Sequence, residues 1–123
     1  MTTTTVNEGD KVNITVNKGK TYDHVFTYTD PDTGAVIDIT GYSARMQIRE
    51  TIDAADYVYQ ALSGGDISLG GVTGQVALSI PAATTAAWEF VSGVYDLELV
   101  SPAGKVIGLV GVSTVKVKPE VTR

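Results

Sequence analysis

Short runs in which apolar and polar residues alternate recur along this chain, and turn residues separate them. In the run from Gln75 to Ile80, for example, Val76, Leu78 and Ile80 share one side. Because side chains alternate between the two faces of a strand, this period of two predicts strands with one buried face. Val, Ile and Thr, which branch at Cβ and suit a pleated sheet, make up one third of the residues. The chain is therefore predicted to be all-β.

The number and spacing of these runs, about eight or nine in all, are typical of a sandwich or barrel. Thirteen glycines and four prolines supply tight turns, which favour antiparallel pairing because parallel strands need long crossovers. One short helical turn is expected near 82–90, where alanines are frequent and Trp88 is placed to close one end of the fold. We expect a single antiparallel β-sandwich, jelly-roll or immunoglobulin-like, over residues 11–123.

Residues 1–10 are polar, rich in threonine and without periodicity, so a flexible N-terminal arm is expected there. Two interpretations remain open. The arm is either a disordered tail or a segment that becomes ordered on a neighbouring subunit. The length of 123 residues leaves room for one domain and little more.

Composition excludes several classes of function. A formal net charge of −5 argues against nucleic acid as a partner, because phosphate contacts need clustered lysines and arginines and the nine here are scattered. The lack of cysteine excludes disulfides and thiolate chemistry. No apolar run approaches the roughly 20 residues of a membrane helix, and the N-terminus lacks the features of a secretion signal. Synthesis in the cytoplasm, with no membrane partner, is therefore expected.

No arrangement of residues predicts an enzyme. His24 is the only histidine, and it alternates in register with Tyr22 and Phe26, as a packed strand residue does. Asp96 and Glu98 lie two apart on one strand and are placed to share a groove, as catalytic acids of glycosidases do. Any solvent-facing strand shows the same spacing, so no catalytic residue and no cofactor is predicted.

Two other patterns are interpreted as turns. Asp30 and Asp32 have the first ligand spacing of a calcium loop, but the later oxygen ligands and the closing glutamate are missing. No metal site is predicted, and weak calcium binding at these two residues is left open. The Gly64-Gly65 and Gly70-Gly71 pairs lack the lysine and the helix N-terminus of a phosphate-binding loop.

The last run, residues 105–118, is apolar on both faces over half its length. An antiparallel sheet usually presents one polar face to water. Three valines on the even-numbered side therefore indicate either a strand covered on both faces or a contact with another subunit. Two tyrosines near residue 58 are open to a similar choice between core edge and interface. The candidate partner interface comprises Val106, Val110, Val112, Tyr57 and Tyr59.

Three stretches resemble a family of small phage structural domains. They are Ile37-Asp38-Ile39-Thr40-Gly41-Tyr42 with Met46-Gln47-Ile48-Arg49, then Gly74-Gln75-Val76-Ala77-Leu78-Ser79-Ile80 with Thr84-Thr85, and Gly93-Val94-Tyr95-Asp96-Leu97-Glu98-Leu99 with the closing Gly111 to Arg123. In order and spacing they are similar to the N-terminal, virion-docking domain of siphophage baseplate upper proteins and to stand-alone phage proteins. The resemblance implies a β-sandwich of the virion that assembles with other virion proteins, in several copies or as a homo-oligomer, and carries no catalytic site.

The resemblance stops at Arg123, before the linker with which baseplate upper proteins continue. A self-contained unit is therefore expected: a capsid decoration or cement protein, or a tail, neck or baseplate accessory. The alternative is a carbohydrate-binding module in which Trp88 or the tyrosines stack on sugar rings. Across the sheet, Arg49 is expected to pair with Asp96 or Glu98.

Overall fold

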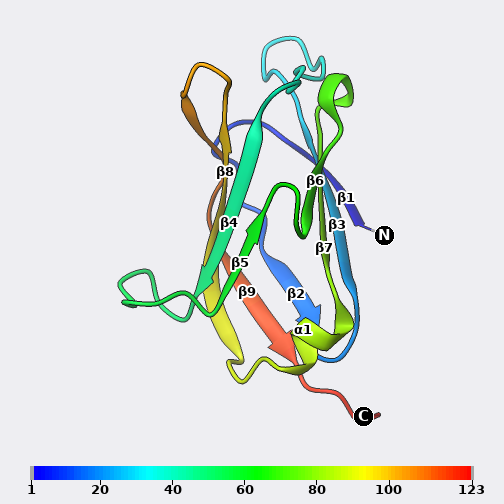
Figure 1. The fold of residues 1–123 in the computed structure, drawn as a ribbon, viewed down its shortest axis with the longest axis vertical. Helices are drawn as coiled ribbons and strands as arrows, with labels where there is room; N and C mark the ends of the chain where they lie inside the picture. The colour runs from blue at the N-terminus through cyan, green and yellow to red at the C-terminus, as the bar shows by residue number, and fades with distance from the viewer. Residues whose placement is uncertain (1, 123) are drawn as a thin grey trace.

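The computed structural model describes residues 2–122, which form nine strands, one 3₁₀ turn and one short α-helix (Figure 1). The elements are β1 (Thr2–Val6), β2 (Ile14–Asn17), β3 (Tyr22–Tyr28), β4 (Ser43–Arg49), β5 (Tyr59–Leu62), β6 (Ile67–Leu69), η1 (Gly71–Thr73), β7 (Gln75–Ile80), α1 (Ala82–Ala86), β8 (Ser92–Val100) and β9 (Val106–Lys118). The prediction of an all-β chain is confirmed.

The strands form two sheets, one of four strands in the order β1-β3-β7-β6 and one of five in the order β2-β9-β8-β4-β5. The expectation of a purely antiparallel sandwich is wrong, because β1 runs parallel to β3 and β2 runs parallel to β9. The other pairs are antiparallel. Both parallel pairs join segments distant in sequence, such as Ile14 with Val115, so no tight turn sets their direction.

The first residues differ from the expected flexible arm, since Thr2–Val6 forms the edge strand β1. The hydroxyl of Thr4 lies 2.8 Å from Nε2 of His24 on β3, and Val6 is buried in the core. Further along, the amide of Gly9 donates to the carbonyl of Gly108, at 2.9 Å. Threonine is β-branched and suits an edge strand even without an apolar alternation. Mobility of this segment stays a prediction.

The core lies between the two sheets and is closed at one end by aromatic residues. The helical turn is shorter than expected, ending at Ala86, and the chain then buries Trp88 and Phe90. The ring of Trp88 meets Tyr59 edge-on at a centroid distance of 5.4 Å and lies 5.0 Å from Phe90. Such tilted aromatic contacts stabilise beyond the area that they bury.

A bulge in β9 changes which of its residues face inward. Glu98 pairs with Gly108, but the neighbouring Leu97 pairs with Val110, so Leu109 is left without a partner on β8. Residues opposite each other in an antiparallel pair point to the same face. Because Leu97 is buried, Val110 also points into the core, and so does the bulged Leu109.

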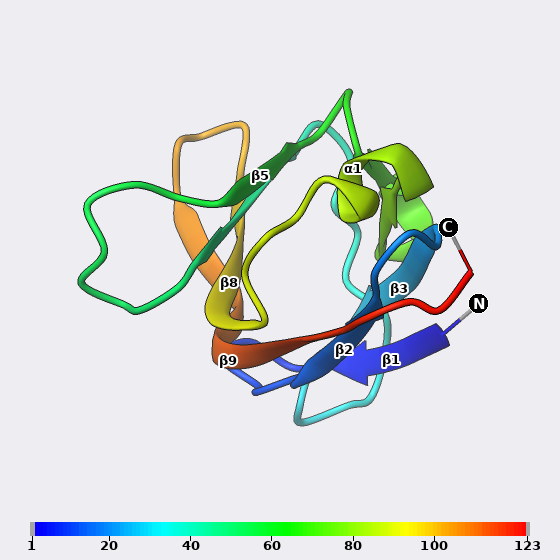
Figure 2. The same cartoon turned by 90° about the horizontal axis from the view of Figure 1, so that it is seen from below.

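Two loops extend from the side of the five-stranded sheet, namely the β4–β5 loop over residues 50–58 and the β8–β9 hairpin. Figure 2 shows the longer β4–β5 loop reaching away from the four-stranded sheet. Within residues 2–122, no helix has the length and apolar character needed to cross a membrane.

Candidate functional site

The outer face of the five-stranded sheet carries a group of charged side chains, namely Arg45, Arg49, Asp96 and Glu98. In β4, the even-numbered residues from Ala44 to Ile48 are buried, so the odd-numbered ones point outward. On β8 the buried residues are odd-numbered, and Asp96 and Glu98 therefore face outward. The antiparallel register places Arg45 opposite Glu98. The predicted sharing of one sheet face by the two acids is confirmed.

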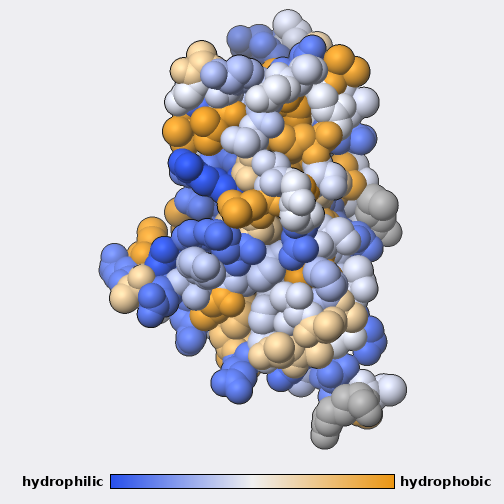
Figure 3. All heavy atoms as spheres, viewed as in Figure 1, coloured by the Kyte–Doolittle hydropathy of each residue, from blue (hydrophilic) through white to orange (hydrophobic). Residues whose placement is uncertain are grey.

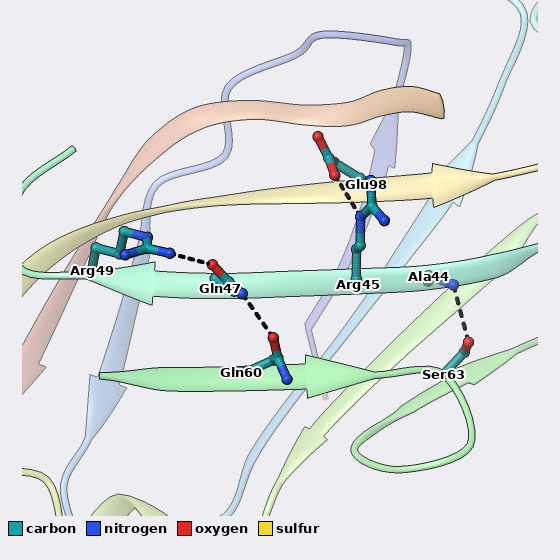
Figure 4. A network of polar contacts seen from close by, with 7 residues as sticks. All are labelled: Ala44, Arg45, Gln47, Arg49, Gln60, Ser63 and Glu98. Carbon is teal, nitrogen blue, oxygen red and sulfur yellow. Dashed lines mark hydrogen bonds and ion pairs between the residues drawn. The ribbon is translucent and has the colours of Figure 1, made fainter. Parts of the chain in front are cut away.

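Hydrogen bonds link these outward side chains into two groups (Figure 4). Nε of Arg45 donates to Oε1 of Glu98 at 2.7 Å. Separately, Arg49 donates to the side-chain oxygen of Gln47 and to the carbonyl of Ala54, each at 2.9 Å. The expected pairing of Arg49 with an acid is therefore wrong, because Arg49 lies opposite Val94 at the end of the ladder, beside the β4–β5 loop.

A double-mutant cycle on Arg45→Ala and Glu98→Ala should give a coupling free energy of about 0.5 kcal/mol in urea unfolding. The value is small because both side chains are partly exposed, at 51% and 34%, and water screens the pair. The matched cycle on Arg49→Ala and Glu98→Ala should give a coupling near zero. Equal coupling in the two cycles would contradict the observed pairing.

A groove of about 320 Å³ lies on this face, between β4, β8 and the β4–β5 loop. Charged and apolar residues line it together, namely Arg45, Met46, Gln47, Arg49, Ile52, Val94, Tyr95, Asp96, Glu98 and Val112. Burial raises the pKa of Asp96 above its usual value, and the charge of Glu98 adds to the effect, while Arg45 and Arg49 act in the opposite direction. The nearby arginines therefore do not fully offset the loss of water around the Asp96 carboxylate.

Exposed apolar side chains surround this polar centre. Val106 and Val112 on β9 are 50% and 45% exposed, and Leu62 at the end of β5 is 48% exposed. Ile52 and Tyr57, both in the β4–β5 loop, are also exposed. On the face seen in Figure 3, hydrophobic side chains lie in separate patches between hydrophilic ones. We call these five residues, together with the groove, the docking face.

Two of the five residues predicted as a partner interface are instead buried. Val110 has no exposed surface because the bulge turns it inward and residues 9–10 cover that part of β9. Tyr59 is 7% exposed, and its hydroxyl donates to Oδ2 of Asp66 at 2.6 Å. Val106, Val112 and Tyr57 are exposed, and their contact with a partner stays a prediction.

His24 is a packed strand residue, as its register predicted. The hydroxyl of Tyr22 lies 2.8 Å from its Nδ1, and the hydroxyl of Thr4 lies 2.8 Å from its Nε2. The ring stacks on Phe26 at a centroid distance of 4.2 Å. Burial lowers the pKa of His24 below its usual value of 6.5. Both ring nitrogens are thus engaged within the four-stranded sheet, away from the docking face.

The free energy of unfolding should fall as pH is lowered from about 7.5 to 5.5. Because the pKa of His24 is lower in the folded protein, the unfolded chain takes up the proton first and is favoured below pH 6.5. His24→Gln should remove most of this slope in urea unfolding. The raised pKa of Asp96 acts at lower pH and with the opposite sign. Equal slopes in the two proteins would contradict the assignment to His24.

The remaining motifs have structural explanations. Oδ1 of Asp30 accepts hydrogen bonds from the amides of Asp32 and Thr33, at 2.8 and 3.4 Å, and so closes the predicted turn. Among residues 2–122 no three histidine, aspartate or glutamate side chains are grouped to hold a metal ion. Trp88 is 6% exposed, which removes it as a stacking platform for a sugar ring.

Sequence reasoning missed Arg45, Leu62 and Ile52 as members of this face. The outward position of Arg45 followed from the alternation in its strand, but its partner depended on the register between β4 and β8. Ile52 lies in a loop without periodicity, so no pattern indicated that it would flank a groove.

No family model matches this chain, and no curated protein matches it. Among solved structures, the chain is similar to one described as the N-terminal domain of phage TP901-1 ORF48, with a TM-score of 0.49 and 9% sequence identity. The likeness covers 98% of this chain and 99% of that chain. At this identity and TM-score it carries no functional argument, which must come from the chain's own residues.

Proposed function

We propose that this chain is a structural protein of a phage virion that docks on other virion proteins through the docking face and performs no catalysis. The observation that carries the proposal is the composition of that face, where exposed apolar side chains surround a hydrogen-bonded polar centre. The order of family-like stretches over about residues 20–123 supports the phage assignment.

The docking face has the properties of a surface for association between folded proteins. Such interfaces are about as apolar as ordinary surface, with aromatic residues and arginine enriched and many polar contacts retained. Tyr57, Arg45 and Arg49 supply these residue types here, and Val106 and Val112 supply the apolar contacts. Charged and apolar residues line the groove together, so the centre of the face is not one broad apolar area.

A non-enzymatic role is consistent with how the candidate catalytic groups are used. His24 is held between two hydroxyl groups, and Glu98 is paired with Arg45. The second acid in the groove with Asp96 is this same Glu98, whose carboxylate Arg45 already holds. These residues serve the packing of one sheet and the surface of the other.

Quantitative mass spectrometry of purified phage particles tests the proposal. We expect the chain to be present in several copies, as symmetric assemblies require. Hundreds of copies would indicate a capsid decoration or cement protein, and about six to eighteen would indicate a tail, neck or baseplate accessory. Absence of the chain from the particles would overturn the proposed function.

A further inference from the structure

The groove of the docking face holds four charged side chains, and three of them already have hydrogen-bond partners. Arg45 and Glu98 bond to each other, and Arg49 donates to Gln47 and to the carbonyl of Ala54. In contrast, the carboxylate of Asp96 makes no hydrogen bond to another residue between 2 and 122. Among the charged residues of this groove, Asp96 is thus the one without a hydrogen bond with another described residue.

The surroundings of Asp96 leave its negative charge only partly balanced. Both arginines lie in the same groove, but their heads are directed to other acceptors, and the pKa of Asp96 is nevertheless raised by its burial. Burial removes part of the water around this carboxylate, and the donor that it gains in exchange is its own backbone amide. A cation that enters the groove therefore stabilises the charged form of Asp96.

The walls of the groove add an apolar component. Val112 and Ile52 are exposed, and Val94 is half-buried beside Asp96. A groove lined by a carboxylate and by aliphatic groups matches a side chain with a methylene stem and a cationic head. Arginine fits this description best, because its planar head bonds both oxygens of a carboxylate and it is enriched in protein interfaces.

We propose that the groove receives an arginine side chain of a neighbouring virion protein, which bonds to Asp96 through its guanidinium and packs its stem on Val94, Val112 and Ile52. The net charge of −5 favours the approach of a partner that is basic at this point. This inference rests on the proposed function and names the chemistry of the partner at that face.

Titration of the ¹⁵N-labelled full chain with N-acetyl-arginine methylamide tests the proposal by NMR. We expect saturable amide shifts in β8 and β9 around Asp96, with a dissociation constant in the millimolar range, as for one charge-assisted contact. The citrulline analogue, which has the same shape without the charge, should produce no saturable shifts.

Two variants decide whether Asp96 is responsible. Asp96→Asn should weaken binding at least about tenfold, while Asp23→Asn should leave it unchanged, because Asp23 lies on the other sheet and bonds to Ser79 at 2.7 Å. Failure to saturate, equal binding by Asp96→Asn, or equal binding of the citrulline analogue would each overturn the proposal. Since the isolated protein is used, such a failure leaves the virion role to be decided by copy number.

Discussion

Replacing Val110 with aspartate should lower the free energy of unfolding by about 4 kcal/mol, a large part of the total stability of an ordinary domain. The residue has no exposed surface and points into the core opposite Leu97. A carboxylate at this position would lose its water without gaining a partner. Urea unfolding followed by circular dichroism measures the loss directly.

The matched control is Val106→Asp, which introduces the same side chain at an exposed position four residues earlier in β9. It should change stability by less than about 1 kcal/mol, because Val106 is half exposed and its neighbours leave the new charge in water. Under the proposed function, the folded Val106→Asp protein should also be depleted from virions, since Val106 belongs to the docking face. Equal stability losses at the two positions would contradict the inward turn of Val110.

The alternation in the last strand predicted its core stripe but not the position of Val110. Ile107, Leu109 and Val115 are buried, as a period of two requires. The bulge brings Val110 to the same side as these residues. In the sequence, the bulge is signalled by the two glycines within the strand, Gly108 and Gly111. A Cβ on Gly111 would lie 3.0 Å from the carbonyl oxygen of Gly9, so this glycine permits residues 9–10 to approach. Which segment approaches depends on contacts far apart in sequence.

The nine strands of residues 2–122 agree with the predicted number of about eight or nine, but they include one strand that the sequence pattern did not indicate. Residues 35–39 lie between two turns and contain Ile37 and Ile39 two apart, as a short strand does, but they form only one isolated bridge, between Thr29 and Val36. Thr2–Val6, in contrast, has no alternation and forms β1. A period of two detects strands with one buried face, and β1 buries only Val6. Edge strands of this kind are specified by a neighbouring backbone rather than by their own pattern.

The site was predictable in its parts but not in its pairing. The outward positions of Asp96 and Glu98 followed from strand alternation, and the choice of Arg45 rather than Arg49 followed from register alone. A shift of β4 by two residues along β8 keeps the same side chains facing outward but changes the partner of Arg45. The groove depends further on the β4–β5 loop, whose path has no periodic signal.

Replacing Gly74 with alanine should cost about 3 kcal/mol of the free energy of unfolding, well above the cost of the same change at Gly34. Both glycines have positive φ, +66° and +73°, so alanine is strained at each by about 1–2 kcal/mol. They differ in surroundings. A Cβ on Gly74 would lie 2.8 Å from the carbonyl oxygen of Ile37 and 3.1 Å from that of Tyr28, whereas a Cβ on Gly34 meets nothing within 4 Å.

The contacts around Gly74 are backbone groups that are themselves held in place. The amide of Tyr28 donates to the carbonyl of Gly74, and the amide of Ile37 donates to the carbonyl of Tyr28, each at 2.9 Å. Relief of the clash therefore requires these hydrogen bonds to lengthen, which adds to the strain of the positive φ. Gly34→Ala should lower the free energy of unfolding by only about 1 kcal/mol, the cost of the positive φ alone. Urea unfolding measures both variants. Equal losses of the free energy of unfolding would contradict the close packing of Gly74, just before β7, against the backbone at the end of β3.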